Sequence, residues 1–514
     1  MFKTAASRLR ALKGRTSAFH RGVARFSSLN DVGTKPSSSS SPFGGLFGWL
    51  IGGNSRSMPP LDFPLSGINL PPALPDHVQP ADVKITTLPN GIKIASLKSE
   101  KPAASVGLYI NCGSVYETLE SSGASHLLER MAFKSTRNRS HLRIVREVEA
   151  IGGNVQASAS REQMAYTFNG LKTNVPEMVE LLIDCVRNPV FLDWEINEEL
   201  PKVKNDISEA SKNPEALVLE AVHSIGYKGG LANPLLAQES SISRLNSNVL
   251  EQFVAENYTA SRMVLAAYGV EHEELLKIAE PLLSDLPSVP TAEEPKSVYT
   301  GGDYRCQGDL GETHFALAFE LPSGWRNEKD AMIVNVLQVL MGGGGSFSAG
   351  GPGKGMHSRL YSRVLNRCSK FHSILAFSSI YNNTGNFGIQ ASTAPDFVTT
   401  AIDMAANELI AIATPGDVDQ VELDRAKKST KSSILMNLES RTVVADDIGR
   451  QILTYNDWKL SQLLKAVDEV SLEDIASIGQ KLLSSPLTMA TYGDFTSATG
   501  VPSYDSVSKK FHLK

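Results

Sequence analysis

One short stretch of the sequence comes close to a metal site. His126 and position 130 lie four residues apart, so they would share one face of a helix. A second His at position 130 would complete His-x-x-Glu-His, in which two His hold a zinc ion and Glu129 activates its water. Position 130 is instead Arg130, whose guanidinium is a permanent cation without a lone pair for a metal. The residues alone therefore predict no zinc site, and His126 by itself is most simply a partly buried helix histidine.

The glycine-rich segment 342–355 is the second candidate. It holds eight Gly in fourteen positions. A phosphate-binding P-loop is excluded, because Ser348 and Gly355 occupy the places of its required Gly and Ser or Thr. Such composition is most often a flexible linker. This segment falls between two expected helices inside a domain, where connections usually span about 2–8 residues, so a functional loop is favoured.

The elements around these residues repeat along the chain. Each half ends in a buried strand with the sequence Ala-x-Tyr-Gly, at 266–269 and 490–493, and the order of strands and helices before it is similar. This repetition indicates a duplicated α+β unit of roughly 200 residues. We therefore expect two homologous α/β-sandwich domains, at 81–285 and 300–514, joined by an inter-domain linker at 286–299.

Periodicity and turn residues give the expected elements within each half. A hairpin is expected around Pro89-Asn90-Gly91. Strand patterns cover 83–88, 92–96, 104–111, 154–170, 263–269, 313–321, 371–393 and 488–493. Helical patterns cover 120–134, 140–151, 174–187, 192–227, 247–257, 328–341, 396–412, 416–437 and 471–483.

The first 30 residues differ in composition from the rest. They carry seven Lys or Arg and no acidic residue, which is typical of a mitochondrial or chloroplast transit peptide; a disordered basic tail is the alternative. We expect a mitochondrial presequence at 1–30, a mature chain that starts near Ser27, and a Ser/Pro/Gly-rich linker at 31–80.

The charge of the remaining chain excludes some classes of partner. Removing the seven leader charges from the net charge of −5 leaves −12 on residues 31–514. An acidic body argues against nucleic acid and favours basic partners. No run of about 18 apolar residues occurs, so no transmembrane span is expected.

The chain resembles the pitrilysin-type metallopeptidase family over nearly all of residues 80–500. The resemblance rests on the duplicated halves, the degenerate His126-x-x-Glu129-Arg130 and the glycine-rich segment. It implies the family fold. In active members a third ligand, a Glu, would stand at the place of Asp206, which lies 76 residues after Arg130. Because Asp206 is shorter by one methylene and faces an Arg, we expect an Arg–carboxylate cluster, no bound metal and no catalysis by this chain.

The glycine-rich segment closely resembles the loop by which a non-catalytic family subunit engages the presequences of imported mitochondrial precursors. The resemblance implies a substrate-recognition subunit that works with a catalytic beta subunit, where zinc is expected. Cationic presequences suit the acidic body. The candidate substrate-binding residues are Gly342, Gly343, Gly344, Gly345, Phe347, Gly350, Gly351, Gly353, Lys354 and Gly355. Glu408, Glu422 and Asp424 are further candidates to meet presequence arginines, with a solvated helix face as the alternative for each.

Two other functions stay open from the sequence. One is a structural core subunit of the respiratory cytochrome bc1 complex, a role that such subunits combine with processing in some lineages of the family. The other is an independently active metallopeptidase, against which Arg130 argues. The expected location is the mitochondrial matrix, or the matrix side of the inner membrane within a bc1 complex, and a plastid remains open as a second destination.

Overall fold

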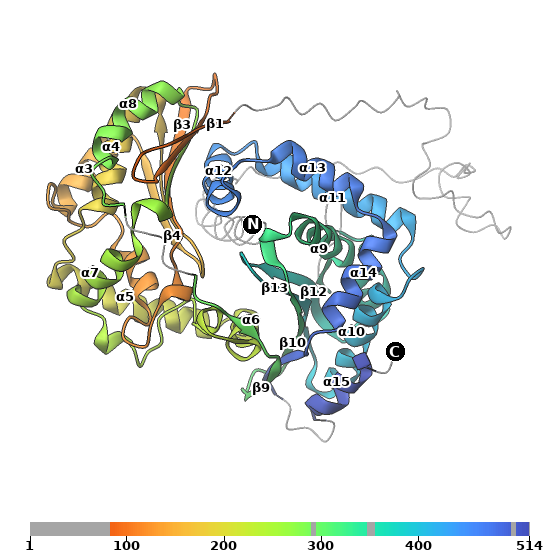
Figure 1. Cartoon of the computed structure of the whole chain (residues 1–514). Coiled ribbons are helices and arrows are strands. Elements are labelled where there is room, and N and C mark those ends of the chain that lie inside the picture. Colours follow the sequence, from red (N-terminus) through yellow and green to blue (C-terminus); the bar gives the residue numbers. More distant parts are fainter. Residues whose placement is uncertain (1–82, 289–293, 347–354, 495–499, 513–514) are drawn as a thin grey trace, which may run out of the picture. The chain divides into compact units, whose positions relative to one another are not determined.

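The computed structural model describes residues 83–288, 294–346, 355–494 and 500–512 of the 514. The expected presequence and the linker after it lie outside these residues. Residues Pro80–Lys514 form one compact unit. Within the described part of the chain, two six-stranded sheets organise the fold (Figure 1).

The first sheet is built by the first half of the chain. Its strands are β1 (Val83–Thr87), β2 (Lys93–Leu97), β3 (Ala103–Ile110), β4 (Asn154–Ala159), β5 (Met164–Leu171) and β7 (Met263–Tyr268). They lie in the order β1-β2-β7-β3-β5-β4, and β2 and β7 form the one parallel pair. The expected hairpin joins β1 and β2, where Gly91 adopts φ +97°, a conformation that favours glycine.

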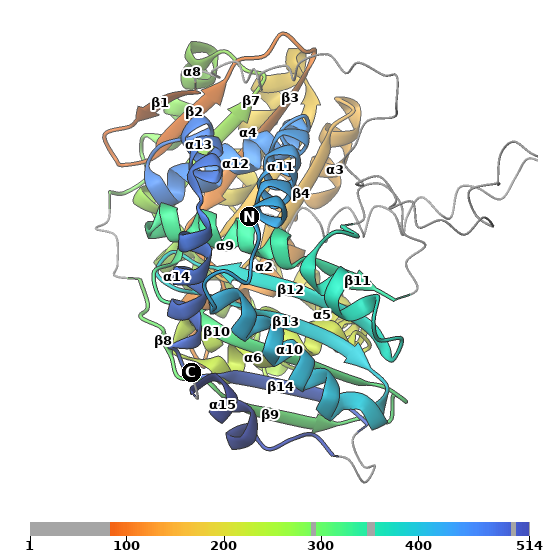
Figure 2. The same ribbon diagram turned by 90° about the vertical axis from the view of Figure 1, so that its right-hand side faces the viewer.

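The second sheet repeats this plan. Its strands are β9 (Gly302–Gln307), β10 (Thr313–Leu321), β11 (Gly343–Gly345), β12 (Phe371–Ile380), β13 (Gly385–Thr393) and β14 (Thr488–Gly493). They lie in the order β11-β12-β13-β10-β14-β9, which Figure 2 displays from top to bottom, and β14 and β9 form the one parallel pair. Five strands therefore match five strands of the first sheet in order and direction. The duplicated α+β fold is confirmed.

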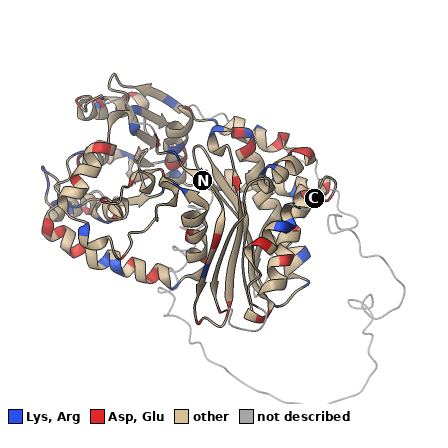
Figure 3. Cartoon of the chain, turned by 60° about the horizontal axis from the view of Figure 1, so that its bottom comes forward, with Lys and Arg blue, Asp and Glu red and all other residues tan. Residues whose placement is uncertain are grey.

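Helices cover the faces of both sheets. The first half contributes α2 (Ala124–Met131), α3 (His141–Ala150), α4 (Val175–Arg187), α5 (Asp193–Ser211), α6 (Pro214–Gly226), α7 (Ser247–Asn257) and α8 (His272–Leu283). The second half contributes α9 (Glu328–Met341), α10 (Val398–Ala413), α11 (Gln420–Asn437), α12 (Arg441–Tyr455), α13 (Leu460–Glu469), α14 (Leu472–Leu483) and α15 (Tyr504–His512). Acidic and basic residues are interspersed along these helices (Figure 3).

One helix from each half of the chain packs on the sheet of the other half. Helix α6 packs Val218 and Val222 into a core with Ala316 and Phe377 of the second sheet. Helix α12 packs Ile448 and other apolar residues onto strands β2, β3, β5 and β7 of the first sheet. This reciprocal exchange buries the sheet faces that the helices of their own half leave open (Figure 1).

Helix α6, which packs on the second sheet, lies in the range 192–227, where the sequence analysis expected one continuous helix. The structure has two helices there, α5 and α6. The side chain of Asn213 accepts a hydrogen bond from the N–H of Ala216, and Pro214 occupies the first turn of α6. Both features start a new helix. Pro201, by contrast, lies inside α5 without ending it.

Candidate functional site

Helix α2 presents the degenerate motif, and a buried carboxylate fixes where this helix begins. Glu117 accepts hydrogen bonds from the N–H groups of Gly123, at 2.8 Å, and Ser125, at 2.9 Å, as well as from the Ser125 hydroxyl. These are amide groups that a helix N-terminus leaves without partners. Burial raises the pKa of Glu117. The contacts hold α2 so that His126 points inward and is buried.

His126, Arg130 and Asp206 come together between α2 and α5. The N–H of Ala237 donates to His126 Nδ1 at 3.3 Å, which assigns the ring proton to Nε2. His126 Nε2 lies 3.4 Å from Asp206 Oδ2. Arg130 Nε donates to the same Oδ2 at 2.7 Å, and a terminal nitrogen of Arg130 contacts both carboxylate oxygens. The expected Arg–carboxylate cluster is therefore present in the geometry.

The charges in this cluster favour a neutral imidazole beside an ion pair. Burial lowers the pKa of His126, and this effect exceeds the opposing effect of Asp206. The hydrogen bonds to Asp206 raise the pKa of Arg130. The guanidinium thus satisfies both oxygens that would otherwise be available to a metal ion.

Glu129, the residue that would activate water in a complete motif, has a structural contact. Its Oε2 accepts a hydrogen bond from the N–H of Ala159 at 3.0 Å. Ala159 ends β4, which is the edge strand of the first sheet. The carboxylate therefore ties α2 to the edge of the sheet.

These residues do not fit a zinc ion. Zinc in a catalytic site needs three protein ligands, and the place of the second His is taken by the guanidinium of Arg130. Within the described ranges, no group of three or more His, Cys, Asp or Glu side chains could hold a metal ion.

Two further polar contacts join α5 to the segment after α2. Lys134 Nζ lies 2.8 Å from Glu199, and the Ser135 hydroxyl donates to Glu195 at 2.7 Å. Burial alone would raise the pKa of Glu199, but its hydrogen bonds to Lys134 and Lys202 lower it overall. The sequence analysis did not identify Glu195 and Glu199. Their spacing of four residues, with Asp206 seven further on, puts all three on one face of α5 and could have revealed them.

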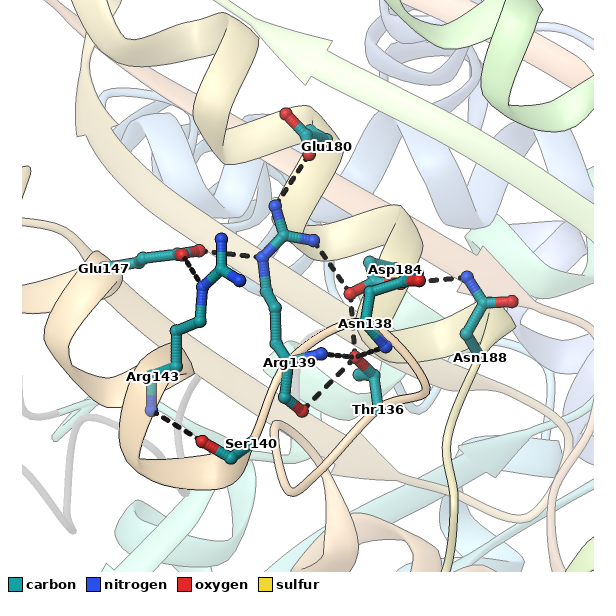
Figure 4. Close-up of polar contacts among 9 residues, drawn as sticks. All are labelled: Thr136, Asn138, Arg139, Ser140, Arg143, Glu147, Glu180, Asp184 and Asn188. Carbon is teal, nitrogen blue, oxygen red and sulfur yellow. Dashed lines mark hydrogen bonds and ion pairs between the residues drawn. The ribbon is translucent and has the colours of Figure 1, made fainter.

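The turn that leads from α2 to α3 is held by a larger polar cluster (Figure 4). Arg139 donates to Glu147 at 2.8 Å, to Glu180 at 2.6 Å and to Asp184 at 2.9 Å. Asp184 also accepts from Thr136 at 2.8 Å, Asn138 at 2.6 Å and Asn188 at 2.9 Å. This cluster fixes the turn onto α4 and thereby positions the segment that carries Lys134.

The N-terminal end of the glycine-rich segment is a short strand, where the sequence analysis expected a loop. Gly343–Gly345 form β11, the edge strand of the second sheet, in antiparallel register with β12. Gly343 has φ +105°, and a Cβ there would lie 2.1 Å from Ile374 O, so only glycine fits. At Gly344 an added Cβ would meet nothing within 4 Å. Phe347, Gly350, Gly351, Gly353 and Lys354 lie outside the described residues, whereas Gly342 and Gly355 lie within them.

Two of the three acidic candidates of the second half are in surroundings that the sequence analysis did not expect, whereas Asp424 lies on a solvated helix face, which was the stated alternative. Glu408, on α10, and Glu422, at the start of α11, both face Arg359. Asp424 is exposed and accepts a hydrogen bond from Gln420 at 2.7 Å. Glu408 and Glu422 are therefore engaged by an arginine of their own chain, a partner that the sequence analysis did not foresee.

Comparison with known proteins gives the family. The model of the insulinase family, peptidase family M16, matches residues 93–239, and the model of the peptidase M16 inactive domain matches residues 244–430. The mitochondrial-processing peptidase subunit alpha of Solanum tuberosum is 65% identical over 100% of both chains. The chain belongs to peptidase family M16.

Two other relatives extend this comparison. The probable mitochondrial-processing peptidase subunit alpha-2, chloroplastic/mitochondrial, of Arabidopsis thaliana is 61% identical over 99% of this chain and 100% of its own. The cytochrome b-c1 complex subunit 2, mitochondrial, of Homo sapiens is 32% identical over 81% of this chain and 90% of its own. Family membership agrees with the two duplicated domains. In the described residues, no helix combines the length and the hydrophobicity needed to cross a bilayer.

Proposed function

We propose that this chain is the non-catalytic, substrate-recognising alpha subunit of a mitochondrial processing peptidase. It would bind the presequences of imported precursors and present them to a catalytic beta subunit. The alpha-subunit relatives, at 65% and 61% identity over practically the whole chain, support this function. The presequence-like composition of residues 1–30 and the names of the relatives support a mitochondrial location.

The proposal that this subunit is non-catalytic is supported by the ion pair between Arg130 and Asp206. The guanidinium binds both carboxylate oxygens, so a zinc ion would have to displace a permanent cation that cannot be deprotonated. Zinc and the cleavage step accordingly belong to the beta partner. This chain needs no cofactor of its own.

Recognition is assigned to the glycine-rich segment. Its described part offers backbone groups at an open sheet edge, where Gly344 places no side chain in the way of a ligand. Backbone contacts suit presequences, which share positive charge and amphipathicity rather than a fixed sequence.

A core role in the cytochrome bc1 complex is the second candidate. The relative named cytochrome b-c1 complex subunit 2 supports it. Purification of the endogenous protein separates the two functions, because a processing peptidase is recovered as a heterodimer with peptidase activity. A core subunit is recovered in a haem-containing inner-membrane assembly, and recovery of both indicates a dual role.

Deletion of residues 347–353 tests recognition directly. This deletion spares β11, so we expect a nearly unchanged melting temperature and normal assembly with the beta subunit. Binding and cleavage of a fluorescent presequence peptide by the assembled heterodimer should be abolished. Phe347→Ala should weaken binding without a loss of stability. Wild-type affinity and cleavage after the deletion would mean that the segment is only a linker.

A further inference from the structure

The face of the second sheet that α6 covers carries a row of polar side chains at one end (Figure 1). Five residues stand directly opposite one another on neighbouring strands: Ser373 on β12, Ser392 on β13, His314 on β10, Tyr492 on β14 and Cys306 on β9. They lie on the side of α6, because His314 precedes Ala316 by two residues and side chains alternate along a strand. We call these five residues the polar row.

Two carboxylates flank the polar row. Glu215, in the first turn of α6, accepts a hydrogen bond from the Ser373 hydroxyl at 3.2 Å, and the hydroxyl oxygens of Ser373 and Ser392 lie 2.8 Å apart. Glu312 Oε1 lies 3.1 Å from His314 Nε2. Within the described part of the chain, neither Glu215 nor Glu312 forms an ion pair with Lys or Arg. The row is therefore flanked by two negative charges that no described cation neutralises.

Two side chains at the row have hydrogen-bond acceptors without donors. His314 is 5% exposed, yet neither of its ring nitrogens makes a hydrogen bond with a described residue. The carboxylate of Glu312 attracts the ring proton to Nε2, which leaves Nδ1 as an acceptor. Gln390 stands opposite Ala316 and so on the same face, and its buried Oε1 also has no donor among the described residues. Buried polar atoms are normally paired, so these acceptors suit a ligand that brings N–H groups.

The polar row is open to a ligand at several points. Three of its members, Ser373, Tyr492 and Cys306, are half-buried, as are both flanking carboxylates. His314 lies buried between them. The row crosses five strands and is roughly 19 Å long, because neighbouring strands lie about 4.8 Å apart. That length accommodates more than one side chain of a bound peptide.

We propose that the polar row binds arginine side chains of presequences, whose guanidinium groups contact the two flanking carboxylates and the acceptors of His314 and Gln390. This inference rests on the recognition function proposed above, to which it adds a contact on the second sheet. A guanidinium fits because it has five N–H donors and no acceptor, and it forms its strongest hydrogen bonds with carboxylates. An acidic side chain would be repelled, and an apolar one would leave the acceptors unpaired.

The test uses this chain assembled with a catalytic beta subunit, and a fluorescent peptide with the sequence of residues 1–30, which contains five Arg. Glu215→Gln and Glu312→Gln should each raise the KM of the peptide by about fivefold, because each variant loses one half-exposed ion pair with the peptide. The kcat should stay nearly unchanged, since neither residue takes part in the cleavage step. Wild-type KM in both variants would overturn the proposal.

Glu320→Gln is the matched control. Glu320 is a half-buried carboxylate on the same strand and face as His314, but it lies at the other end of β10 and accepts a hydrogen bond from Thr384. The control should leave the KM unchanged. A loss as large as that of Glu215→Gln would mean that any negative charge on this face has the same effect, and would overturn the assignment to the polar row.

A second peptide, in which every Arg is replaced by neutral citrulline, tests whether the row recognises charge. Glu215→Gln and Glu312→Gln should leave the KM of this peptide nearly unchanged, because it has no guanidinium to lose a partner. An equal loss with both peptides would overturn the proposal, since the carboxylates would then act without contacting arginine.

His314→Leu extends the test to the buried acceptor and should also raise the KM of the arginine peptide. Melting temperatures and assembly with the beta subunit are measured for each variant. The two Gln variants replace half-exposed groups, so they decide the question even if His314→Leu fails to fold. A wild-type heterodimer that neither binds nor cleaves the peptide would refute the recognition function itself. Normal processing by the wild type, with unchanged KM in the variants at 215, 312 and 314, would refute the polar row alone.

Discussion

At position 130 a guanidinium stands where an imidazole would complete a zinc site. The change does more than remove a ligand, because Arg130 binds Asp206 through two of its nitrogens and leaves a neutral His126 beside them. The cluster still joins α2 to α5, as a metal ion would, but it does so with hydrogen bonds and charge.

Restoring the imidazole alone should therefore restore little. We expect the isolated chain to bind no stoichiometric zinc, and Arg130→His to bind it weakly, because Asp206 is short and the surrounding residues are not adapted. Errors around a metal site typically cost about 10–100-fold in affinity. Arg130→His/Asp206→Glu should bind zinc more tightly than the single variant. Metal analysis after gel filtration measures this, and about one zinc per wild-type chain would contradict the assignment.

Among the secondary-structure elements and their connections, the turn between α2 and α3 is fixed in place by side-chain contacts. Arg139 and Asp184 convert this turn into a fixed connection on α4 (Figure 4). Asp184 is buried, and burial alone would raise its pKa. The hydrogen bonds from Asn188, Asn138, Arg139 and Thr136 outweigh burial and lower the pKa overall.

This depressed pKa gives the turn a defined pH dependence. Its contribution to stability is fully present above the ordinary aspartate pKa of about 4 and is lost as the pH falls through the lower folded-state value. Asp184→Asn should cost about 1–3 kcal/mol at pH 7 and should weaken the loss of stability in acid. Urea unfolding between pH 3 and pH 7 measures both effects. Glu180→Gln removes an exposed partner of Arg139 and should cost at most about 1 kcal/mol; an equal loss in both variants would contradict the role of Asp184.

At the scale of the whole chain, the exchange of α6 and α12 makes the two halves interdependent. Each sheet has a face that is covered by a helix from the other half. Helix α12 crosses the first sheet at Tyr109, whose hydroxyl donates to Asp446 at 3.0 Å. Gly449 allows this close approach, because a Cβ there would lie 2.1 Å from Tyr109 Cδ2.

Gly449→Ala should accordingly destabilise the protein by about 1–3 kcal/mol through overpacking. The loss should be smaller in a Tyr109→Ala background, where the ring that causes the clash is absent. Thermal or urea unfolding of the four proteins in this cycle measures the coupling. Gly344→Ala, where the added methyl group meets open space, is the control for glycine replacement. Additive losses at 109 and 449 would mean that the close approach does not limit the packing.

The hairpin turns of the two sheets also meet, and this contact should respond to pH. Glu162, in the β4–β5 turn, accepts the N–H of Asn382, in the β12–β13 turn, at 3.0 and 3.2 Å. Burial raises the pKa of Glu162 to about 8; Glu294 adds to the rise, while Arg326 and the Asn382 N–H oppose it. A raised carboxyl pKa contributes stability below the unfolded value of about 4.5, and this contribution is lost as the pH rises toward 8.

Glu162→Gln keeps a neutral acceptor and removes the charge. The variant should gain stability relative to the wild type as the pH is raised from about 5 to 8, and the difference should be largest near pH 8. Unfolding curves at several pH values measure this difference. A difference that is constant over this range would mean that Glu162 titrates in the same way in both states.

Features that depend on neighbouring residues could be predicted from the sequence. The bounds predicted from periodicity agree with the structure for the helices at 247–257 and 328–341 and for the strand at 313–321. An apolar helix face or a buried strand can be recognised from residues that are close together in the sequence. The duplication and the pairing of Arg130 with Asp206 were also predictable, from repeated order and from family resemblance.

The helix that covers each sheet and the charges that meet could be seen only in the folded chain. Helices α12 and α13 and strand β9 were not predicted, and neither was the division of 192–227 into two helices that serve different sheets. Arg359 meets Asp417 and Glu422, 58 and 63 residues away, so no local spacing in the sequence could reveal its cage of carboxylates. Such contacts follow from how the two halves and their connections pack, because burying a sheet face or a charge requires a partner but does not say where in the chain it lies.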